Sequence, residues 1–244
     1  MASVVPPVIA ELTLAQKQEL SDYLSQFVTA ERQAKIERIL SQRTRHLTVM
    51  VEDFHLSQNA SAVLRTAEGL GIQDIHIVEN ENSFKLNRDV TRGSNKWLTL
   101  HQYNAEARNN TADCFEVLRQ RGYKLAATCP HEAAFEPEDL PLDKPVALLM
   151  GSEHAGLSDY ALENADYAVK IPMDGFLESF NVSVSAAICL YVLTRRLKQQ
   201  QDIPWPLSNE EKTHLRLDWF TMSSRSSEAL IDQFLAKQGW GEAV

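Results

Sequence analysis

Four polar residues stand at the start of one of the most apolar segments of the chain. They are Ser179, Asn181, Ser183 and Ser185. The segment that they introduce, residues 180–200, has the helical periodicity and the apolar surface of a buried helix. Hydroxyl and amide groups at the mouth of a buried helix raise the question of which ligand or side chain they face.

Asn59 and Arg65 are the candidates on a second predicted helix, residues 58–71, which follows an apolar run at 47–51. By itself Asn59 is best explained as the cap of this helix, since asparagine is a preferred N-cap residue. Arg65 and Glu68 are three positions apart, so they could form an ion pair on the helix surface. Arg65 nevertheless borders the buried face, close to the carboxyl end of the preceding strand, where open α/β sheets bind ligands.

The segment Gly151-Ser-Glu-His-Ala-Gly156 resembles half of a phosphate-binding loop. Leu157 and Ser158 stand where that loop requires lysine followed by serine or threonine, so binding of a nucleoside triphosphate is excluded. A tight turn is the simpler explanation of the two glycines, and close approach of the backbone to a ligand is the alternative. No G-x-G-x-x-G motif follows a predicted strand, which argues against a dehydrogenase and against a Rossmann-type methyltransferase.

The composition limits the class of protein. The chain has 244 residues, of which 44% are hydrophobic and 23% charged, as in a globular protein of one large or two small domains. Its three cysteines are scattered, which favours a reducing compartment over a disulfide framework. No residues have the spacing of a metal site. Because a signal peptide and the run of about 18 apolar residues of a membrane span are also lacking, we expect a cytoplasmic protein without a membrane partner.

The net charge of −9 argues at first against a nucleic-acid partner, but the cations are concentrated in two segments. Residues 31–46 hold five cations and two acids, and residues 85–96 hold four cations and one acid, so each segment carries a net charge of +3. Such basic segments on an acidic body can bind a polyanion. From charge alone, the favoured explanation is an ordinary protein surface that contains lysine and arginine.

Strands and helices alternate along the central part of the chain. The predicted strands are 47–51, 74–79, 97–103, 124–129, 146–151 and 168–172. This alternation predicts an α/β fold with a mostly parallel sheet and helices on both faces, flanked by N- and C-terminal helices. We divide the chain into an N-terminal helical extension (1–43), an α/β domain (44–200) and a C-terminal helical extension (201–244).

The order of the polar motifs adds a resemblance to a known family. The motifs are Asn59-Ala-Ser-Ala-Val-Leu-Arg65-Thr-Ala-Glu68, Gly93-Ser-Asn-Lys-Trp97, Leu148-Leu-Met-Gly-Ser-Glu-His-Ala-Gly-Leu157, and Ile171-Pro-Met173 with Glu178-Ser-Phe-Asn-Val-Ser-Val-Ser185. Together they resemble the SpoU/TrmH family of RNA 2'-O-ribose methyltransferases over about residues 44–200. The resemblance is specific, because four separated motifs agree in order and in strand or helix context.

The resemblance implies features that periodicity does not show. The C-terminal half of the sheet would form a deep trefoil knot, an exception to the un-knotted topology of most proteins. The knot loops would bind S-adenosylmethionine as methyl donor, with no metal, and the protein would be a homodimer. By motif matching, the cofactor-binding residues would be Thr128, Gly151, Ser152, Glu153, Gly156, Ile171, Met173, Ser179 and Phe180. The helix at 180–200 would pack the knot and the dimer, with its polar mouth toward the cofactor and the catalytic arginine.

The same match proposes Arg65, Asn59, Glu153, Ser179 and Asn181 as catalytic residues. The reaction would be attack of a ribose 2'-oxygen on the methyl group of the cofactor. Arginine is a poor base, because the pKa of a guanidinium exceeds about 12. We therefore expect Arg65 to fix an RNA phosphate and to stabilise the negative charge that develops on the 2'-oxygen. The proton would leave in concert or pass to the phosphate or to water.

The expected substrate follows from the same resemblance. The N-terminal helices, and the lack of a separate large RNA-binding domain, resemble the tRNA guanosine branch of the family, which implies a D-loop guanosine at position eighteen. The residues expected to contact RNA phosphates are Arg43, Arg45, Arg88, Arg92, Lys96, Arg195 and Arg196. Ribosomal RNA is the alternative substrate. A non-catalytic RNA-binding or assembly factor with the same fold is the alternative of another class.

Overall fold

The computed structural model describes residues 7–129 and 134–240 of the chain. The chain forms two compact units, of which one is Thr44–Trp205 and the other joins Met1–Arg43 to Pro206–Val244. The central unit continues past residue 200, because Ile203 and Trp205 pack against its core. Within the described ranges, no helix combines the length and the apolar surface that a membrane span requires.

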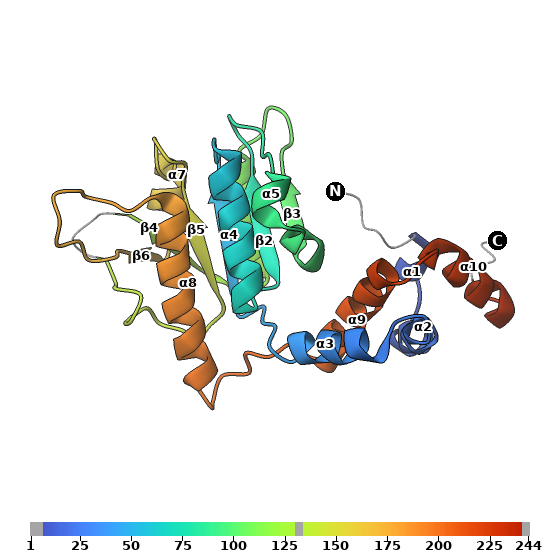
Figure 1. Ribbon diagram of the computed structural model, residues 1–244. Coiled ribbons are helices and arrows are strands. Elements are labelled where there is room, and N and C mark those ends of the chain that lie inside the picture. Colours follow the sequence, from blue (N-terminus) through green and yellow to red (C-terminus); the bar gives the residue numbers. More distant parts are fainter. Residues whose placement is uncertain (1–6, 130–133, 241–244) are drawn as a thin grey trace. The chain divides into compact units, whose positions relative to one another are not determined.

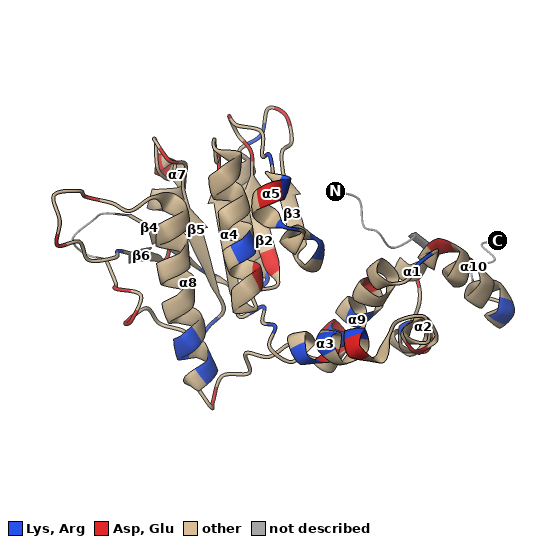
Figure 2. Cartoon of the chain, viewed as in Figure 1, with Lys and Arg blue, Asp and Glu red and all other residues tan. Residues whose placement is uncertain are grey.

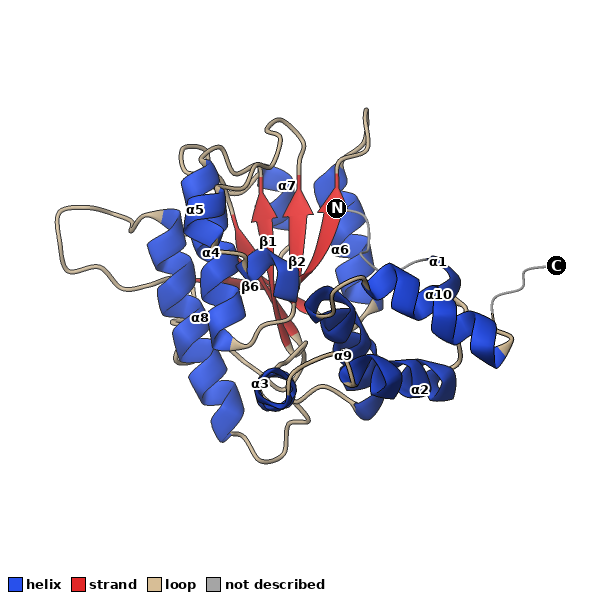
Figure 3. Cartoon of the chain, turned by 45° about the vertical axis from the view of Figure 1, so that its right-hand side comes forward, coloured by secondary structure: helices blue, strands red, loops and turns tan. Residues whose placement is uncertain are grey.

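Among the described residues, the central unit contains a six-stranded sheet in which all neighbouring strands run parallel (Figure 3). The strands are β1 (Leu47–Glu52), β2 (Asp74–Val78), β3 (Thr99–Tyr103), β4 (Lys124–Thr128), β5 (Val146–Met150) and β6 (Tyr167–Val169). Their spatial order is β3-β2-β1-β5-β4-β6. The predicted parallel α/β sheet is confirmed. The predicted strand at 97–103 is shorter than expected, because a 3₁₀ helix, η1 (Ser94–Trp97), precedes it.

Helices cover both faces of the sheet because alternate strand residues point in opposite directions. The covering helices are α4 (Ser57–Leu70), α6 (Asn110–Gln120), α7 (Asp159–Glu163) and α8 (Val182–Gln199). Val49 and Val51 of β1 pack into a core with α4 and α8, which lie side by side (Figure 1). Met50 of the same strand points to the other face and packs with α6 and α7.

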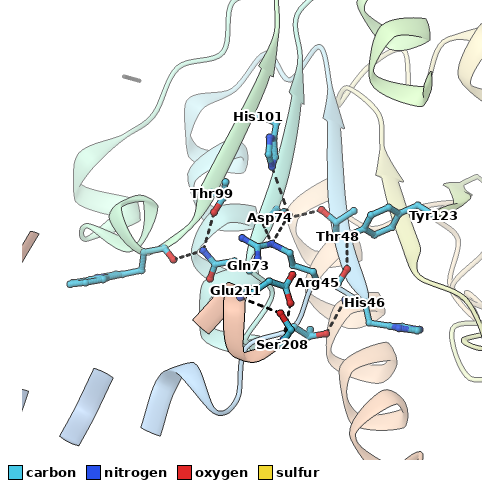
Figure 4. Close-up of polar contacts among 12 residues, drawn as sticks. Arg45, His46, Thr48, Gln73, Asp74, Thr99, His101, Tyr123, Ser208 and Glu211 are labelled. Carbon is cyan, nitrogen blue, oxygen red and sulfur yellow. Dashed lines mark hydrogen bonds and ion pairs between the residues drawn. The ribbon is translucent and has the colours of Figure 1, made fainter. Parts of the chain in front are cut away.

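The flanking unit is helical and contains both ends of the described chain. Its helices are α1 (Pro7–Ala10), α2 (Leu14–Ser25), α3 (Ala30–Leu40), α9 (Asn209–Ser223) and α10 (Ser227–Gln238). Capping boxes, Thr13 with Gln16 and Ser208 with Glu211, begin α2 and α9. Figure 4 includes the second of these boxes. Because α2 packs along α9, helices predicted as separate extensions stabilise each other.

Arg43 lies in the interior of this flanking unit. Its side chain is 0% exposed, and its guanidinium carbon is 5.3 Å from the centre of the Trp219 ring, within the range of a cation–π contact. Arg43 was predicted to contact RNA. We correct that prediction, because a fully enclosed guanidinium cannot reach a phosphate without leaving the core of the unit.

A polar cluster on β2 and β3 interrupts the apolar core of the central unit. Asp74 is 2% exposed and pairs with Arg45, whose Nε lies 3.0 Å from Asp74 Oδ2, and with His101 at 3.7 Å (Figure 4). The ring of His76 is completely buried and stacks on His101, with 4.6 Å between the ring centres. The Nδ1 of His76 and the hydroxyl of Tyr103 share a hydrogen bond of 2.9 Å. A buried histidine of this kind is held neutral.

The buried ring of His76 is expected to make the protein less stable as the pH falls. Burial, followed by the charge of His101, lowers the pKa of His76 from 6.5 to about 3. Above pH 6.5 the ring is neutral in both the folded and the unfolded chain, so it contributes nothing. Between pH 6.5 and about 3 only the unfolded chain binds the proton, which costs up to about 1.4 kcal/mol of stability per pH unit.

Chemical denaturation near pH 7 and near pH 5 measures this effect. The wild type should lose more stability between the two conditions than His76→Phe, which keeps a ring but has no titratable group. The comparison concerns the pH dependence, because the missing hydrogen bond to Tyr103 changes the absolute stability of the variant. An equal pH dependence of the two proteins would contradict the expectation.

Candidate active site

The nine residues predicted to bind the cofactor line one cavity of about 450 Å³ in the central unit. They are Thr128, Gly151, Ser152, Glu153, Gly156, Ile171, Met173, Ser179 and Phe180. The cavity is formed where β4, β5 and β6 end and where the loop before α8 returns to the sheet. This is the edge at which parallel α/β sheets bind ligands.

The turn Gly151–Gly156 is both a tight turn and a wall of the cavity. Its ends are joined by two backbone hydrogen bonds between Ser152 and Gly156, of 2.9 Å and 3.1 Å. A Cβ atom on Gly151 would lie 2.0 Å from the carbonyl carbon of Gly156, so no other residue fits there. Gly156 has a φ of +72°, which glycine adopts without strain. The tight turn is therefore confirmed as the explanation of the two glycines, and the approach of the backbone to a ligand stays a prediction.

Glu153 is the centre of a hydrogen-bond network at the rim of this cavity. Its Oε1 accepts hydrogen bonds from Asn59 Nδ2 at 2.7 Å and from the backbone N–H of Leu56 at 3.2 Å, and its Oε2 accepts one from the N–H of His55 at 3.1 Å. Burial raises the pKa of the Glu153 carboxyl, but these donors outweigh burial, so the pKa lies below its usual range. The group is therefore an anion that fixes the loop before α4.

Asn181 extends the network to the start of α8. Its Nδ2 donates to Asn59 Oδ1 at 3.2 Å, while its Oδ1 accepts from the N–H and the hydroxyl of Ser183, at 2.9 Å and 2.6 Å. Asn181 is thus the N-cap of α8. The interpretation of Asn59 as an N-cap was wrong, because α4 begins at Ser57 and Asn59 instead joins Glu153 to Asn181.

Arg65 is placed apart from this network. Its side chain is exposed on α4, and its Nη1 lies 3.5 Å from the carbonyl oxygen of Val90, at the limit of a hydrogen bond. It is absent from the described residues that line the cavity, whereas Glu153, Ser179 and Asn181 are among them. The chain therefore does not bring Arg65 into the wall of this cavity.

Three of the predicted RNA-binding residues lie on or at the end of elements that pack against α4, the helix of Arg65. Arg88, Arg92 and Lys96 are exposed, and the elements that carry them, α5 (Arg88–Thr91) and η1, pack against α4. Figure 2 shows the basic residues on α4 and around α5. These cations and Arg65 form an exposed basic surface, which we call the α4–α5 basic surface.

The other predicted RNA-binding residues of the central unit differ in their surroundings. Arg195 is exposed near the end of α8. Arg196 donates from Nη1 to the carbonyl oxygens of Pro137 and Leu140, at 2.7 Å and 2.9 Å, and therefore holds a loop. Arg45 is already paired with Asp74. Of the seven predicted positions, three of the four that are exposed in the central unit therefore belong to the α4–α5 basic surface, and the fourth is Arg195.

Sequence reasoning missed about half of the cavity wall. The additional lining residues are Cys129, Met150, His154, Ala155, Leu157, Val169, Lys170, Glu178, Val182 and Cys189, and Ser185 lines the cavity as part of the polar mouth expected to face the cofactor. Most are neighbours of predicted residues within the same motifs, so extending each motif by one or two positions would have found them. Cys189 is the exception, because it reaches the cavity from the third turn of α8 and has no local signal.

The arrangement fits a small organic ligand. The wall combines apolar side chains such as Met150, Leu157 and Ile171 with a few polar groups, the usual composition of a small-molecule site. In the part of the chain that the structure describes, no group of three or more His, Cys, Asp or Glu residues is placed to hold a metal ion. The α4–α5 basic surface fits a polyanion.

Comparisons with known proteins agree with these two features. A model described as the SpoU rRNA Methylase family matches residues 46–191. The tRNA (guanosine(18)-2'-O)-methyltransferase of Borreliella burgdorferi is 41% identical over 197 residues, which are 81% of this chain and 88% of that protein. The crystal structure of the Aquifex aeolicus TrmH/SpoU tRNA modifying enzyme superposes with a TM-score of 0.69 at 27% identity, over 79% of this chain and 96% of that one.

A further similar structure was solved with a cofactor. The SpoU methyltransferase AviRb from Streptomyces viridochromogenes, in complex with AdoMet, has a TM-score of 0.55 at 25% identity. The match covers 65% of this chain and 60% of that one.

Proposed function

The chain belongs to the SpoU rRNA methylase family, and from this premise we propose that it methylates the ribose 2'-hydroxyl of guanosine 18 in tRNA with S-adenosylmethionine as the donor. The observation that carries the proposal is the network of Asn59, Glu153 and Asn181, which joins three separate motifs at the rim of one cavity. The name of the B. burgdorferi relative supports tRNA as the substrate. A tRNA substrate in turn supports a cytoplasmic location.

The cavity has the size and the walls that the cofactor needs. Its volume of about 450 Å³ lies within the range of small-molecule sites, and Gly151 allows the backbone of the turn that forms one wall to close on itself. When bound, S-adenosylmethionine supplies a methyl group that its sulfonium makes electrophilic. Thr128, the turn Gly151–Gly156, Ile171, Met173 and the loop through Phe180 would hold it.

The residues of the chain would act mainly by position and charge. Glu153 accepts three hydrogen bonds and has a lowered pKa, so we assign it the task of fixing the rim rather than of taking the proton. Asn59 and Asn181 hold the starts of α4 and α8 together. Arg65 binds a phosphate next to the target ribose and stabilises negative charge on the 2'-oxygen, which a guanidinium can do without losing a proton.

We propose a homodimer because α8 exposes an apolar surface. Val184 and Tyr191 are 44% and 58% exposed and lie two turns apart on α8, and Phe176 and Leu177 of the preceding loop are 109% and 74% exposed. Apolar side chains gathered in this way commonly form an interface, and a second copy can cover them with the same helix about a two-fold axis. The dimer also offers a position for Arg65 of one protomer beside the cavity of the other.

We further propose the trefoil knot of the family. Its support is the strand order β1-β5-β4-β6, in which the chain leaves β5 and passes β4 to reach the edge of the sheet. The loops on either side of this crossing, Gly151–Gly156 and the segment before α8, are the ones that line the cavity. A knot would fix both loops relative to each other without further contacts.

Transfer of a labelled methyl group tests the proposed function. The purified protein is incubated with labelled S-adenosylmethionine and, in parallel, with unmodified tRNA or with ribosomal RNA fragments, and the product is mapped by mass spectrometry. We expect label on the ribose of guanosine 18. Label on ribosomal RNA fragments alone would keep the reaction and replace the substrate, and binding of RNA without any transfer would favour a non-catalytic factor.

Neutralising the α4–α5 basic surface is expected to weaken tRNA binding and its dependence on salt. Arg88→Gln and Arg92→Gln each remove one cation that can displace a counterion from a phosphate. The slope of log affinity against log salt should fall by about 0.7 to 0.9 for each phosphate that is no longer neutralised. Arg108→Gln is the matched control, since Arg108 is also exposed but already pairs with Asp113 at 2.8 Å. An unchanged slope in the double variant would mean that Arg88 and Arg92 do not contact RNA phosphates.

A further inference from the structure

Asp53 binds the backbone of the segment that follows β2 and leads to the α4–α5 basic surface. One oxygen of its carboxylate, Oδ1, accepts three consecutive backbone N–H groups, those of Asn80 at 2.7 Å, Glu81 at 2.8 Å and Asn82 at 3.2 Å. In return Asn82 Nδ2 donates to the carbonyl oxygen of Asp53 at 3.3 Å. A carboxylate that accepts hydrogen bonds from three successive backbone N–H groups fixes the conformation of that backbone.

Ser61 forms a hydrogen bond with the same segment at residue 87. Its side chain lies in the buried face of α4, 0% exposed, and its hydroxyl oxygen accepts the N–H of Asn87 at 2.7 Å. Asn87 is the N-cap of α5, the short helix that begins with Arg88. Arg65, one turn further along α4, contacts Val90 of α5. The start of the basic segment is therefore attached to the helix that carries Arg65.

We propose that Asp53 and Ser61 are positioning residues that hold residues 80–92 in the conformation that binds RNA. With both attachments in place, the segment that carries Arg88 and Arg92 is held against α4 before RNA arrives, so little conformational freedom is lost on binding. The ligand is the phosphate backbone of the substrate RNA, and the inference rests on the proposed function in this respect. Neither residue has a group that the methyl transfer itself requires.

Glu52, the residue before Asp53, supplies a natural comparison. Glu52 ends β1, whereas Asp53 follows it with a φ of +51°, outside the strand conformation. The Glu52 carboxylate accepts hydrogen bonds from Thr111 and from the N–H and hydroxyl of Ser158, the latter two at 2.8 Å each. Ser158 follows Leu157, which lines the cavity. Asp53 thus binds the backbone N–H groups of the chain that leads to the basic surface, whereas Glu52 binds Ser158 beside the cavity. Glu52 reaches residue 80 indirectly, through Thr111, whose hydroxyl accepts a hydrogen bond from the side chain of Asn80 at 3.0 Å.

Three variants distinguish the holding of residues 80–92 from the holding of the loop beside the cavity. Asp53→Asn keeps the shape of the side chain and tolerates the φ of +51° at this position, but removes the charge. Ser61→Ala removes only a hydroxyl and favours the helix. Glu52→Gln is the control. For each, backbone hydrogen exchange of residues 80–92 is measured, with tRNA affinity, the KM and kcat of methyl transfer, and calorimetric binding of S-adenosylhomocysteine.

We expect faster exchange at residues 80–87 in Asp53→Asn and Ser61→Ala, but not in Glu52→Gln. Each of the two variants should bind tRNA about two- to tenfold more weakly, because Asp53→Asn loses the charge that strengthens its hydrogen bonds and Ser61→Ala loses one hydrogen bond. The KM for tRNA should rise with little change in kcat. Their affinity for S-adenosylhomocysteine should equal that of the wild type. Glu52→Gln should show the opposite pattern, with weaker cofactor binding and unchanged tRNA affinity.

Two results would overturn the inference. Unchanged exchange at residues 80–87 would show that the two side chains do not hold the segment, and faster exchange with wild-type tRNA affinity would show that RNA binding does not need it held. A wild-type protein that binds no tRNA would instead contradict the proposed function. The failures are therefore distinguishable, because the first two are seen only by comparing variants with a wild type that binds tRNA.

Discussion

Arg65→Ala is expected to lower kcat for methyl transfer to tRNA by about a hundredfold to a thousandfold, the usual effect of removing one donor that stabilises charge in a transition state. Affinity for S-adenosylhomocysteine should not change, because Arg65 does not line the described cavity. Folding should be preserved, since the side chain is exposed on α4. Single-turnover transfer of labelled methyl, with cofactor binding by calorimetry, measures both quantities.

Arg65→Lys distinguishes charge from geometry. Lysine keeps the positive charge but lacks the planar fork that binds a phosphate through two parallel hydrogen bonds. We expect kcat to fall steeply in this variant too, while tRNA affinity changes less. Arg108→Lys, at an exposed arginine outside the basic surface, is the control. Near-normal turnover of Arg65→Lys would mean that Arg65 contributes only net charge.

The second large effect is expected at Gly151. In Gly151→Ala the new Cβ would stand 2.0 Å from the carbonyl carbon of Gly156 and 2.1 Å from the nitrogen of Leu157. Both are backbone atoms, so the turn must move and the wall of the cavity with it. We expect the variant to lose measurable binding of S-adenosylhomocysteine.

The control for this loss is Gly175→Ala, where a Cβ would meet nothing within 4 Å. Circular dichroism and thermal melting establish whether Gly151→Ala still folds. Wild-type affinity in a folded Gly151→Ala protein would contradict the assignment of this cavity to the cofactor.

The two variants together test where Arg65 acts. If each site combines the cavity of one protomer with Arg65 of the other, an Arg65→Ala/Gly151→Ala heterodimer contains one intact site. Equal mixing with free exchange should then restore about a quarter of wild-type activity, because half of the dimers are mixed and each has one site. Continued inactivity of a mixture that has demonstrably exchanged would place Arg65 and the cavity in the same protomer.

The sequence predicted the sheet and its covering helices, because these depend on local periodicity. The run at 47–51 became β1, and the helix at 58–71 became α4 with a shift of one residue at each end. Such elements can be predicted because the residues that define them are neighbours in the sequence. The residues chosen by motif matching line one cavity.

Contacts between distant residues were not predictable in this way. The hydrogen bond between Asn59 and Glu153 spans 94 residues, and the one between Asn181 and Asn59 spans 122. From its neighbours in the sequence alone, Asn59 is a good helix cap. Only the folded chain shows that its side chain instead forms hydrogen bonds with Glu153 and Asn181. The burial of Arg43 was missed for the same reason, since its partner Trp219 lies on a helix far along the chain.

The composition of the flanking unit affects how the protein is made. One part of this unit, Met1–Arg43, leaves the ribosome before the central unit, and the other, Pro206–Val244, leaves after it. At about 5–20 residues per second, the first part waits roughly ten to thirty seconds for its packing partner. Throughout that interval α2 and α3 lack their packing partner α9, whereas every strand of the described sheet has been synthesised by its end. Synthesis of α9 is therefore the event that lets the two parts fold together, and a nascent chain stalled before residue 206 would carry an unfolded N-terminal segment.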